Sequence, residues 1–347
     1  MNSYGIMAAS AAILSFAITL ALGKFFIPFL HKLKYGQTIL EIGPSWHKNK
    51  QGTPTMGGIM FIIGILVSTA ICIPFYYKLS EFMGIHRIET PLMAAKIFCG
   101  LAMAVGYGLI GFIDDYVKVR KKQNQGLTPK QKLILQFAVV ILYFAAIHIM
   151  NNTFGGENLT KVGIPFFGKV DLGFFYYIIL SLVVVGIVNA ANLTDGVDGL
   201  CTSVTFLIAI FYMIMTNLLG MFGLSIESAA LAGGCLGFLI WNLHPARVFM
   251  GDTGSLFLGG IVCALGLGSG LYVPMIILSS IYIAEMFSVI LQVLYFKISG
   301  GKRLFKMSPI HHHFEMLGWS ENKICTVFGL CTAVMGIISI LLVVNNI

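Results

Sequence analysis

The chain has 347 residues, of which 57% are apolar and only 10% are charged. An ordinary globular domain is about 45–50% apolar, and no stretch of this chain is long and polar enough to form one, so composition excludes the two soluble domains that length alone would suggest. The net charge of +8 does not indicate nucleic acid, because the basic residues follow a membrane topology. We expect one all-α integral membrane domain over residues 1–347.

Apolar runs that are long enough to cross a bilayer recur along the whole chain. A membrane-spanning helix needs about 17–25 such residues. The first run has no Lys or Arg before it, which distinguishes it from a cleaved secretory signal. The seventh run is short, and the break between the eighth and ninth is narrow. The ten expected spans are 5–29, 53–74, 91–113, 131–150, 173–191, 200–219, 226–241, 255–272, 274–296 and 322–345.

Basic residues divide the connections between these spans into two sets. Most Lys and Arg residues lie in connections that follow odd-numbered spans, whereas connections after even-numbered spans hold only Lys78, Arg87, Lys161 and Lys169. Cytoplasmic connections of membrane proteins carry the excess of positive charge. The odd-numbered connections are therefore predicted to be cytoplasmic, and both termini are predicted to lie outside.

Two connections are long enough to have structure of their own. The outward segment 151–172 mixes Gly, Asn and short β-prone runs, which predicts a small hairpin. The cytoplasmic segment 297–321 opens with Gly, is basic and aromatic, and contains Pro309, which disfavours a continuous helix. It predicts a structured loop or a short amphipathic helix at the membrane interface.

Five of the six aspartates fall beside apolar spans on the predicted cytoplasmic face. They are Asp114 and Asp115 in GFIDDYVK, Asp195 and Asp198 in NLTDGVDGL, and Asp252 in FMGDTGS. Oxygen ligands suit Mg²⁺, which commonly bridges carboxylates to substrate phosphates. The grouping therefore predicts an enzyme of phosphate chemistry whose active site is built from cytoplasmic loops.

Each aspartate motif also has a structural interpretation. Asp114 and Asp115 end the third expected span, where they either solvate the helix end or form a pair in which repulsion raises one pKa, giving a base or nucleophile beside a metal. Asp198 precedes the sixth span and is either an N-cap or part of a site with Asp195. Asp252 precedes the eighth span, where it either caps the helix or belongs to a phosphate-binding loop.

Two further groups of polar residues are candidates for function. His311, His312 and His313 are consecutive, so their side chains point apart and do not suit three converging zinc ligands; donation to phosphate oxygens fits better. Glu285 lies deep in the ninth expected span. An intramembrane carboxylate is a functional candidate by default, although it can also serve only as a hydrogen-bond partner for a neighbouring helix.

Five motifs follow one another along the chain: GTPTMGG (52–58), GFIDDYVK (111–118), NLTDGVDGL (192–200), WNLHPARVFMGDTGS (241–255) and SPIHHHFE (308–315). In this order they resemble the motifs of the phospho-N-acetylmuramoyl-pentapeptide transferase family, which belongs to the polyprenyl-phosphate N-acetylhexosamine-1-phosphate transferase superfamily. The likeness covers essentially the whole chain. The paired aspartates and the NxxDGxDG element are shared across the superfamily, whereas GTPTMGG and HHHFE are typical of the muramoyl-pentapeptide branch.

The resemblance implies a reaction and its partners. Phospho-MurNAc-pentapeptide would pass from UDP-MurNAc-pentapeptide to undecaprenyl phosphate, giving lipid I and UMP, with Mg²⁺ as the cofactor. The enzyme would be a multi-pass protein of the bacterial plasma membrane with its active site on the cytoplasmic side. The lipid bilayer is a further expected partner, a homodimer is left open, and nucleic acid is not expected.

The resemblance also implies roles for individual residues. Asp252 is the expected metal ligand, Asp114 the base that deprotonates the lipid phosphate, and Asp115 a support for the lipid-phosphate site. Direct displacement is favoured over a phospho-aspartate intermediate. The expected nucleotide-pocket residues are Asn192, Asp195, Asp198, Asn242 and Phe249. The residues expected to neutralise diphosphate charge are Lys50, His311, His312 and His313.

Two other functions fit parts of the sequence. A sister enzyme that transfers GlcNAc-1-phosphate or a related sugar would share the aspartate motifs. A transporter or flippase would share the ten spans and an intramembrane Glu285, but transporter sites lie near the bilayer midplane at broken helices. The polar motifs of this chain gather at one face, which argues against transport.

Overall fold

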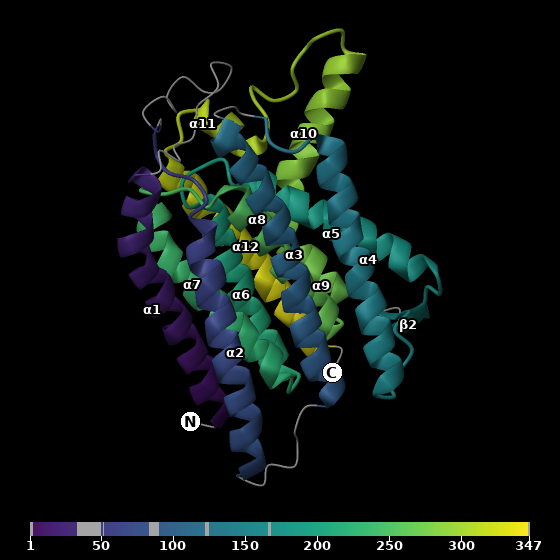
Figure 1. Cartoon of the computed structure of the whole chain (residues 1–347). Helices are drawn as coiled ribbons and strands as arrows, with labels where there is room; N and C mark the ends of the chain where they lie inside the picture. Colours follow the sequence, from purple (N-terminus) through teal and green to yellow (C-terminus); the bar gives the residue numbers. More distant parts are fainter. Residues whose placement is uncertain are drawn as a thin grey trace.

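The protein is described by a computed structural model. It covers residues 3–32, 50, 52–82, 90–121, 125–165 and 168–345. The helices form a bundle in which the chain repeatedly crosses from one end to the other (Figure 1). Some basic residues of the predicted topology, namely Lys34, Lys48, Arg87 and Lys122, lie outside the described residues.

The ten expected membrane spans are confirmed: the described residues contain ten helices that are long and apolar enough to cross a membrane. Each matches one expected span, although the second helix begins only at Gly58, the last residue of the GTPTMGG segment. The helices are α1 Ser3–Lys32, α2 Gly58–Phe82, α3 Pro91–Lys121, α4 Pro129–Thr153, α5 Phe175–Thr194, α6 Leu200–Leu218, α7 Phe222–Asn242, α8 Gly251–Ser269, α10 Ser280–Ile298 and α12 Glu321–Val344.

The shorter elements lie in the connections. Strands β1 (Lys161–Ile164) and β2 (Gly168–Asp171) pair antiparallel, with Val162 opposite Val170, so the predicted hairpin is confirmed. The expected ninth span is two helices, because α9 (Tyr272–Leu278) is separated from α10 at Ser279.

The segment 297–321 contains a short helix, α11 (Ile310–Glu315), as the sequence predicted. In Figure 1 the end of α10 projects beyond the bundle, and α11 lies back at the same end of the molecule.

The third helix is longer than its apolar run. It continues to Lys121, so Asp114 and Asp115 lie inside α3 and do not end it, which corrects the expectation. Asp114 forms an i,i+4 ion pair with Lys118 at 2.6 Å. The last turn is basic, and positive charge there interacts favourably with the helix dipole. These charges explain why the helix extends beyond the point where its sequence stops being apolar.

The centre of the bundle is α8, whose residues from Thr253 to Ser269 are all buried. Many of them are small, which allows neighbouring helices to approach closely. On α3, a Cβ added at Gly111 would overlap the backbone carbonyl of Asp252. This close approach brings the two aspartates of α3 next to the first turn of α8.

Gly111 is therefore expected to tolerate no side chain. Gly111→Ala should lower the free energy of unfolding by about 1–3 kcal/mol, the usual cost of overpacking. The loss would be measured as a lower thermal midpoint in detergent. Gly186→Ala in α5 is the matched control, because a Cβ there meets no atom within 4 Å. The free energy of unfolding of this control should be unchanged or higher by about 0.5–1 kcal/mol, because alanine is more favourable than glycine inside a helix. Equal midpoints for both variants would contradict the close α3–α8 contact.

Candidate active site

Asp115 binds the first turn of α8. Its carboxylate accepts hydrogen bonds from Thr253 N at 2.9 Å, Thr253 Oγ1 at 2.7 Å and Asp252 N at 3.2 Å. The first N–H groups of a helix have no partner within the helix, and a carboxylate there also interacts favourably with the dipole. Asp115 thus caps α8 from a different helix. Asp252 itself is not the cap, because the N-cap position belongs to Met250.

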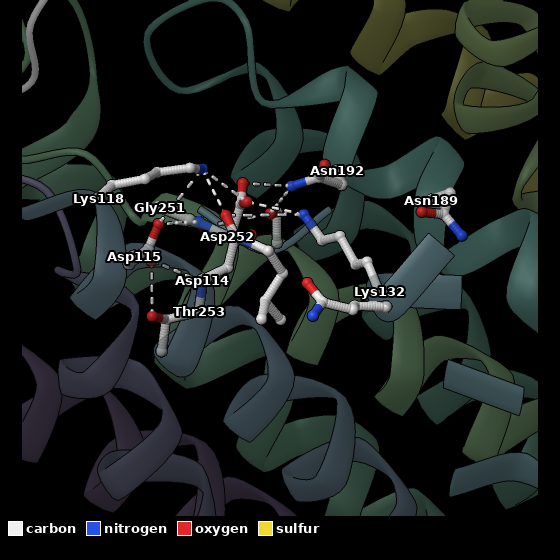
Figure 2. Close-up of polar contacts among 12 residues, drawn as sticks. Asp114, Asp115, Lys118, Lys132, Asn189, Asn192, Gly251, Asp252 and Thr253 are labelled. Atoms are coloured by element: carbon white, nitrogen blue, oxygen red, sulfur yellow. Dashed lines mark hydrogen bonds and ion pairs between the residues drawn. The ribbon is translucent and has the colours of Figure 1, made fainter. Parts of the chain in front are cut away.

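Asp252 stands in the first turn of α8 at the centre of a polar cluster (Figure 2). Its Oδ2 accepts from Lys118 Nζ at 2.9 Å and from Lys132 Nζ at 2.7 Å, and its Oδ1 accepts from Asn192 Nδ2 at 2.8 Å. The two lysines approach it from opposite sides, one from α3 and one from α4. Side chains from α3, α4 and the end of α5 therefore converge on one carboxylate of α8.

Asp114 shares a cation with Asp252. The Lys118 ammonium lies 2.6 Å from Asp114 Oδ2 and 2.9 Å from Asp252 Oδ2, and Asp114 Oδ1 accepts from Leu127 N at 2.8 Å. Both aspartates belong to helices that are packed tightly together, so their negative charges would otherwise repel. The bridging ammonium offsets that repulsion.

A second cluster surrounds Lys50. Its ammonium lies 2.7 Å from Asp198 Oδ1 and 2.7 Å from Glu321 Oε2. Burial acts to lower the pKa of Lys50, but the hydrogen bonds from its ammonium to Asp198 and Glu321 outweigh burial and raise it. Lys50 is therefore held as a cation beside two carboxylates, ahead of the GTPTMGG segment.

Asp198 is not a helix cap, so that alternative is wrong. The N-cap of α6 is Gly199, with φ +78° and no side-chain cap bond. The Asp198 carboxylate instead contacts His244 Nδ1 at 3.1 Å and accepts from Ala246 N at 3.0 Å. Its side chain joins the α5–α6 turn to the α7–α8 loop.

Asp195 lies in the same turn and is half-buried. Burial raises its pKa well above the usual range, and the carboxylates of Asp252, Asp115 and Asp198 raise it further, while Lys50 opposes them. Asp195 therefore lies within electrostatic reach of both clusters. Together with the clusters themselves, it shows that the five aspartates predicted to share one face do gather at one end of the bundle.

Asn242 and Phe249 hold the loops of the site together. Buried Asn242 accepts from Gly199 N and Thr202 Oγ1, each at 3.2 Å, and donates to Val248 O at 3.0 Å. The Phe249 backbone donates to Pro54 O at 2.8 Å and its carbonyl accepts from Gly57 N at 2.8 Å. These bonds connect the α7–α8 loop to the α5–α6 turn and to the GTPTMGG segment.

The three consecutive histidines have three different partners. His311 Nδ1 lies 3.1 Å from Glu285 Oε2, His312 Nδ1 lies 2.6 Å from Glu315 Oε2, and His313 Nδ1 accepts from Lys306 N at 3.1 Å. The rings of His311 and His312 lie next to each other, with their centroids 4.1 Å apart, so the expectation that these side chains point apart is wrong for that pair.

Glu285 lies inside α10, one of the helices apolar enough to cross a membrane, and its carboxylate contacts His311 of the short helix α11.

Comparison with known proteins identifies the family. Residues 97–270 match the model for glycosyl transferase family 4, and residues 50–62 match the phospho-N-acetylmuramoyl-pentapeptide-transferase signature 1. Curated phospho-N-acetylmuramoyl-pentapeptide-transferases are 43% identical in Bacillus pumilus and 42% in Bacillus subtilis, each over 94% of this chain and 95% of the relative. One from Clostridium perfringens is 44% identical over 93% of this chain and 95% of the relative. The chain belongs to the phospho-N-acetylmuramoyl-pentapeptide transferase family.

In this family member, sequence reasoning missed Lys132, Glu321 and His244 as site residues. Lys132 follows a capping box formed by Thr128 and Gln131. This local pattern indicates the start of α4, but it does not indicate which residue the lysine contacts. Glu321 lies in the first turn of α12, where an acidic residue is ordinary for any helix. His244 lies inside the quoted motif WNLHPARVF, and that motif was the available signal.

The carboxylates of this site fit a divalent cation. Asp114, Asp115 and Asp252 each offer an oxygen, and these oxygens lie within 4.8 Å of one another. An all-oxygen donor set suits Mg²⁺. Because Asp115 is engaged by the first turn of α8, Asp252 and Asp114 are the better placed ligands. The Lys118 ammonium already bridges these two carboxylates, as a metal ion would.

Lys118 and a divalent cation should therefore compete for the same place. In EDTA, Lys118→Met should lower the free energy of unfolding by on the order of 1–2 kcal/mol, which is between the values for breaking an exposed and a buried ion pair. Adding Mg²⁺ should then raise the thermal midpoint more in the variant than in the wild type. Lys121→Met, at the exposed end of α3, is the control. A variant that gains no more from Mg²⁺ than the wild type would contradict this overlap.

Asp195 should make the protein less stable as the pH rises. A carboxyl whose pKa is raised in the folded state binds its proton more tightly there, so folding weakens as pH rises above the unfolded value of about 3.9. In EDTA, Asp195→Asn should reduce this loss across a pH series of thermal midpoints. Asp171→Asn should act at lower pH and with the opposite sign: hydrogen bonds from Thr160 and Gly173 lower the Asp171 pKa, so the wild type gains stability as the pH rises toward about 3.9, and the variant should lose that gain. Parallel curves for wild type and Asp195→Asn would contradict the assignment.

Proposed function

We propose that the chain transfers phospho-MurNAc-pentapeptide from UDP-MurNAc-pentapeptide to undecaprenyl phosphate, giving lipid I and UMP. This is the first membrane step of peptidoglycan synthesis. Membership of the transferase family supports the reaction. The observation that carries it is the convergence of Asp114, Lys118, Lys132 and Asn192 on Asp252 at the start of α8. Paired carboxylates and cations at a helix N-terminus suit the binding of a cation together with phosphates.

The position of the site suits two substrates from different phases. The nucleotide substrate is soluble and strongly anionic, whereas the acceptor is anchored in lipid. A site at the end of a bundle of ten apolar helices meets both. The distribution of basic residues supports a cytoplasmic orientation of this end in the bacterial plasma membrane.

Magnesium is the proposed cofactor, held by Asp252. When bound, it would neutralise charge on the diphosphate and on the attacking phosphate. The residues around it have complementary tasks. Lys118 and Lys132, which contact Asp252, would donate to phosphate oxygens. This is the electrostatic stabilisation on which phosphoryl transfer chiefly depends.

Asp114 is the proposed base. Asp115 accepts three hydrogen bonds from the first turn of α8, so its task is to hold α8 and thereby Asp252. Asp114 has a carboxylate oxygen on the Lys118 side, where it would accept the proton of the lipid phosphate. In the direct displacement that we favour, the lipid phosphate oxygen forms a bond to the sugar-linked phosphorus, and the bond from that phosphorus to UMP breaks.

The second cluster is proposed to serve the nucleotide side. The α5–α6 turn with Asp195 and Asp198, half-buried Phe249 and the amide of Asn192 would line the nucleotide pocket. Asn242 would act indirectly, since it joins the loops of that pocket. Lys50 and the histidines of α11 would neutralise the diphosphate as charge develops.

A sister transferase of GlcNAc-1-phosphate is the second candidate, because the aspartate motifs are common to both. The signature match over residues 50–62, which includes Lys50 and GTPTMGG, favours the muramoyl-pentapeptide substrate. A transporter is disfavoured, since the polar clusters lie at one end of the bundle.

The deciding experiment measures UMP release by the purified protein with undecaprenyl phosphate, with and without Mg²⁺. UDP-MurNAc-pentapeptide should be turned over only with the cation, and UDP-GlcNAc should not be. Asp252→Ala should lower turnover by at least about a hundredfold while the protein stays folded in detergent. Asp171→Ala, which removes the one aspartate on the outward hairpin, should leave turnover near the wild-type rate.

Three outcomes would overturn parts of this proposal. Turnover of UDP-GlcNAc alone would establish the sister enzyme. Normal turnover by Asp252→Ala would remove the metal assignment. Isolation of a phosphorylated Asp114 or Asp115 in the absence of lipid would replace direct displacement with a phospho-enzyme.

A further inference from the structure

Glu285 and His311 form a fully buried pair between α10 and α11. The Glu285 side chain is 0% exposed and that of His311 is 1% exposed. Glu285 Oε2 lies 3.1 Å from His311 Nδ1 and 3.4 Å from His311 N. One carboxylate oxygen thus contacts both the ring and the backbone of the same residue. Because the carboxylate contacts both the ring and the backbone of His311, rotation of the His311 ring is restricted more than by a single contact.

The opposite edge of the His311 ring faces the α5–α6 turn. A Cβ at Gly196 would overlap His311 Nε2, so the ring lies against the backbone between Asp195 and Asp198. Both ring nitrogens are buried, and neither has a hydrogen-bond partner among the described residues. Buried polar nitrogens without a partner are costly. The two differ in their surroundings, because Nδ1 lies within ion-pair distance of Glu285 Oε2, whereas Nε2 lies beside the backbone of the turn that carries Asp195 and Asp198.

We propose that Glu285 is a positioning residue, which holds His311 so that Nε2 is presented to the Asp195–Asp198 turn and to the anionic oxygens of the substrate bound there. The inference rests on the proposed function. The protonation and orientation of one imidazole nitrogen are set by what the other nitrogen meets. Glu285 Oε2 lies beside Nδ1 at 3.1 Å, and Nε2 is on the ring edge that faces the turn.

The surroundings of Glu285 argue against a purely structural pair. Its second carboxylate oxygen, Oε1, is buried and has no hydrogen-bond partner in the described part of the chain. Replacing both members of a buried charged pair with apolar residues is often neutral or stabilising, so stability alone does not account for a buried Glu–His pair. His312 and His313 have partners of their own on the same loop. The His311 ring lies against the aspartate turn.

A double-mutant cycle tests whether Glu285 acts through His311. The cycle compares wild type, Glu285→Gln, His311→Ala and the double variant by UMP release. Glu285→Gln should lower kcat about ten- to a hundredfold, as loss of an orienting partner does, with little change in KM. The double variant should be no slower than His311→Ala, because Glu285 then has nothing to position.

Glu227→Gln is the matched control. Glu227 is also a buried carboxylate in a membrane-spanning helix, and it too has an oxygen without a hydrogen-bond partner in the described chain. Its replacement should leave kcat near the wild-type value. If the fold-losses of kcat from the two single variants multiply in the double variant, the positioning role is overturned. A wild-type kcat for Glu285→Gln would also overturn it.

A second variant disturbs His311 without changing Glu285. Gly196→Ala places a methyl group on Nε2 and should lower kcat in the wild-type background but not further in His311→Ala. Gly186→Ala, which meets no atom within 4 Å, controls for the added methyl group. An undiminished kcat for Gly196→Ala would contradict the placement of Nε2, and this result does not depend on Glu285→Gln folding.

The two proposals fail in different ways. Absence of wild-type UMP release from UDP-MurNAc-pentapeptide would overturn the proposed function, whereas an active wild type with multiplying losses would overturn only the positioning role. Thermal midpoints of the same four proteins without substrate provide a readout besides activity. The midpoint change on replacing Glu285 should be smaller in the His311→Ala background; equal changes would show that the two residues are not coupled.

Discussion

The Asp115 carboxylate of α3 accepts hydrogen bonds from the first turn of α8, and this contact determines where the other polar groups of the site lie. It satisfies N–H groups that the start of a helix leaves without partners. It also requires α3 and α8 to be close, which the absent side chain of Gly111 permits. With α8 held there, Asp252 of its first turn is placed within reach of Lys118, Lys132 and Asn192.

Charge compensation is the second constraint. Five carboxylates at one end of an apolar bundle repel one another, and burial increases that repulsion. Two lysine-centred clusters offset it: Lys118 and Lys132 contact Asp252, and Lys50 contacts Asp198 and Glu321. The same lysines are suited to phosphate oxygens. A site that is stable before substrate arrives can therefore exchange carboxylate partners for phosphate partners during the reaction.

Much of the fold could be predicted from the sequence, because apolar length and the position of basic residues report directly on a membrane environment. All ten spans were predicted in this way, whereas the hairpin followed from its Gly, Asn and β-prone residues, and segment 297–321 was predicted as a structured loop or a short helix. The errors occurred where local pattern and tertiary contact disagree. The apolar run of α3 ends near Asp114, yet the helix continues. Asp198 occupies a typical capping position, yet its side chain is taken by Lys50 and His244.

The sequence by itself determined the class of protein, the number of spans and the gathering of aspartates at one end, since these depend on composition and order along the chain. Only the tertiary structure decided which partner each charged group has. Lys132 and Glu321 look like ordinary helix residues locally, and the contacts that place them in the site are made with residues more than 20 positions away. Helix packing brings such residues together, and the spacing along one helix carries no record of the side chains presented by its neighbours.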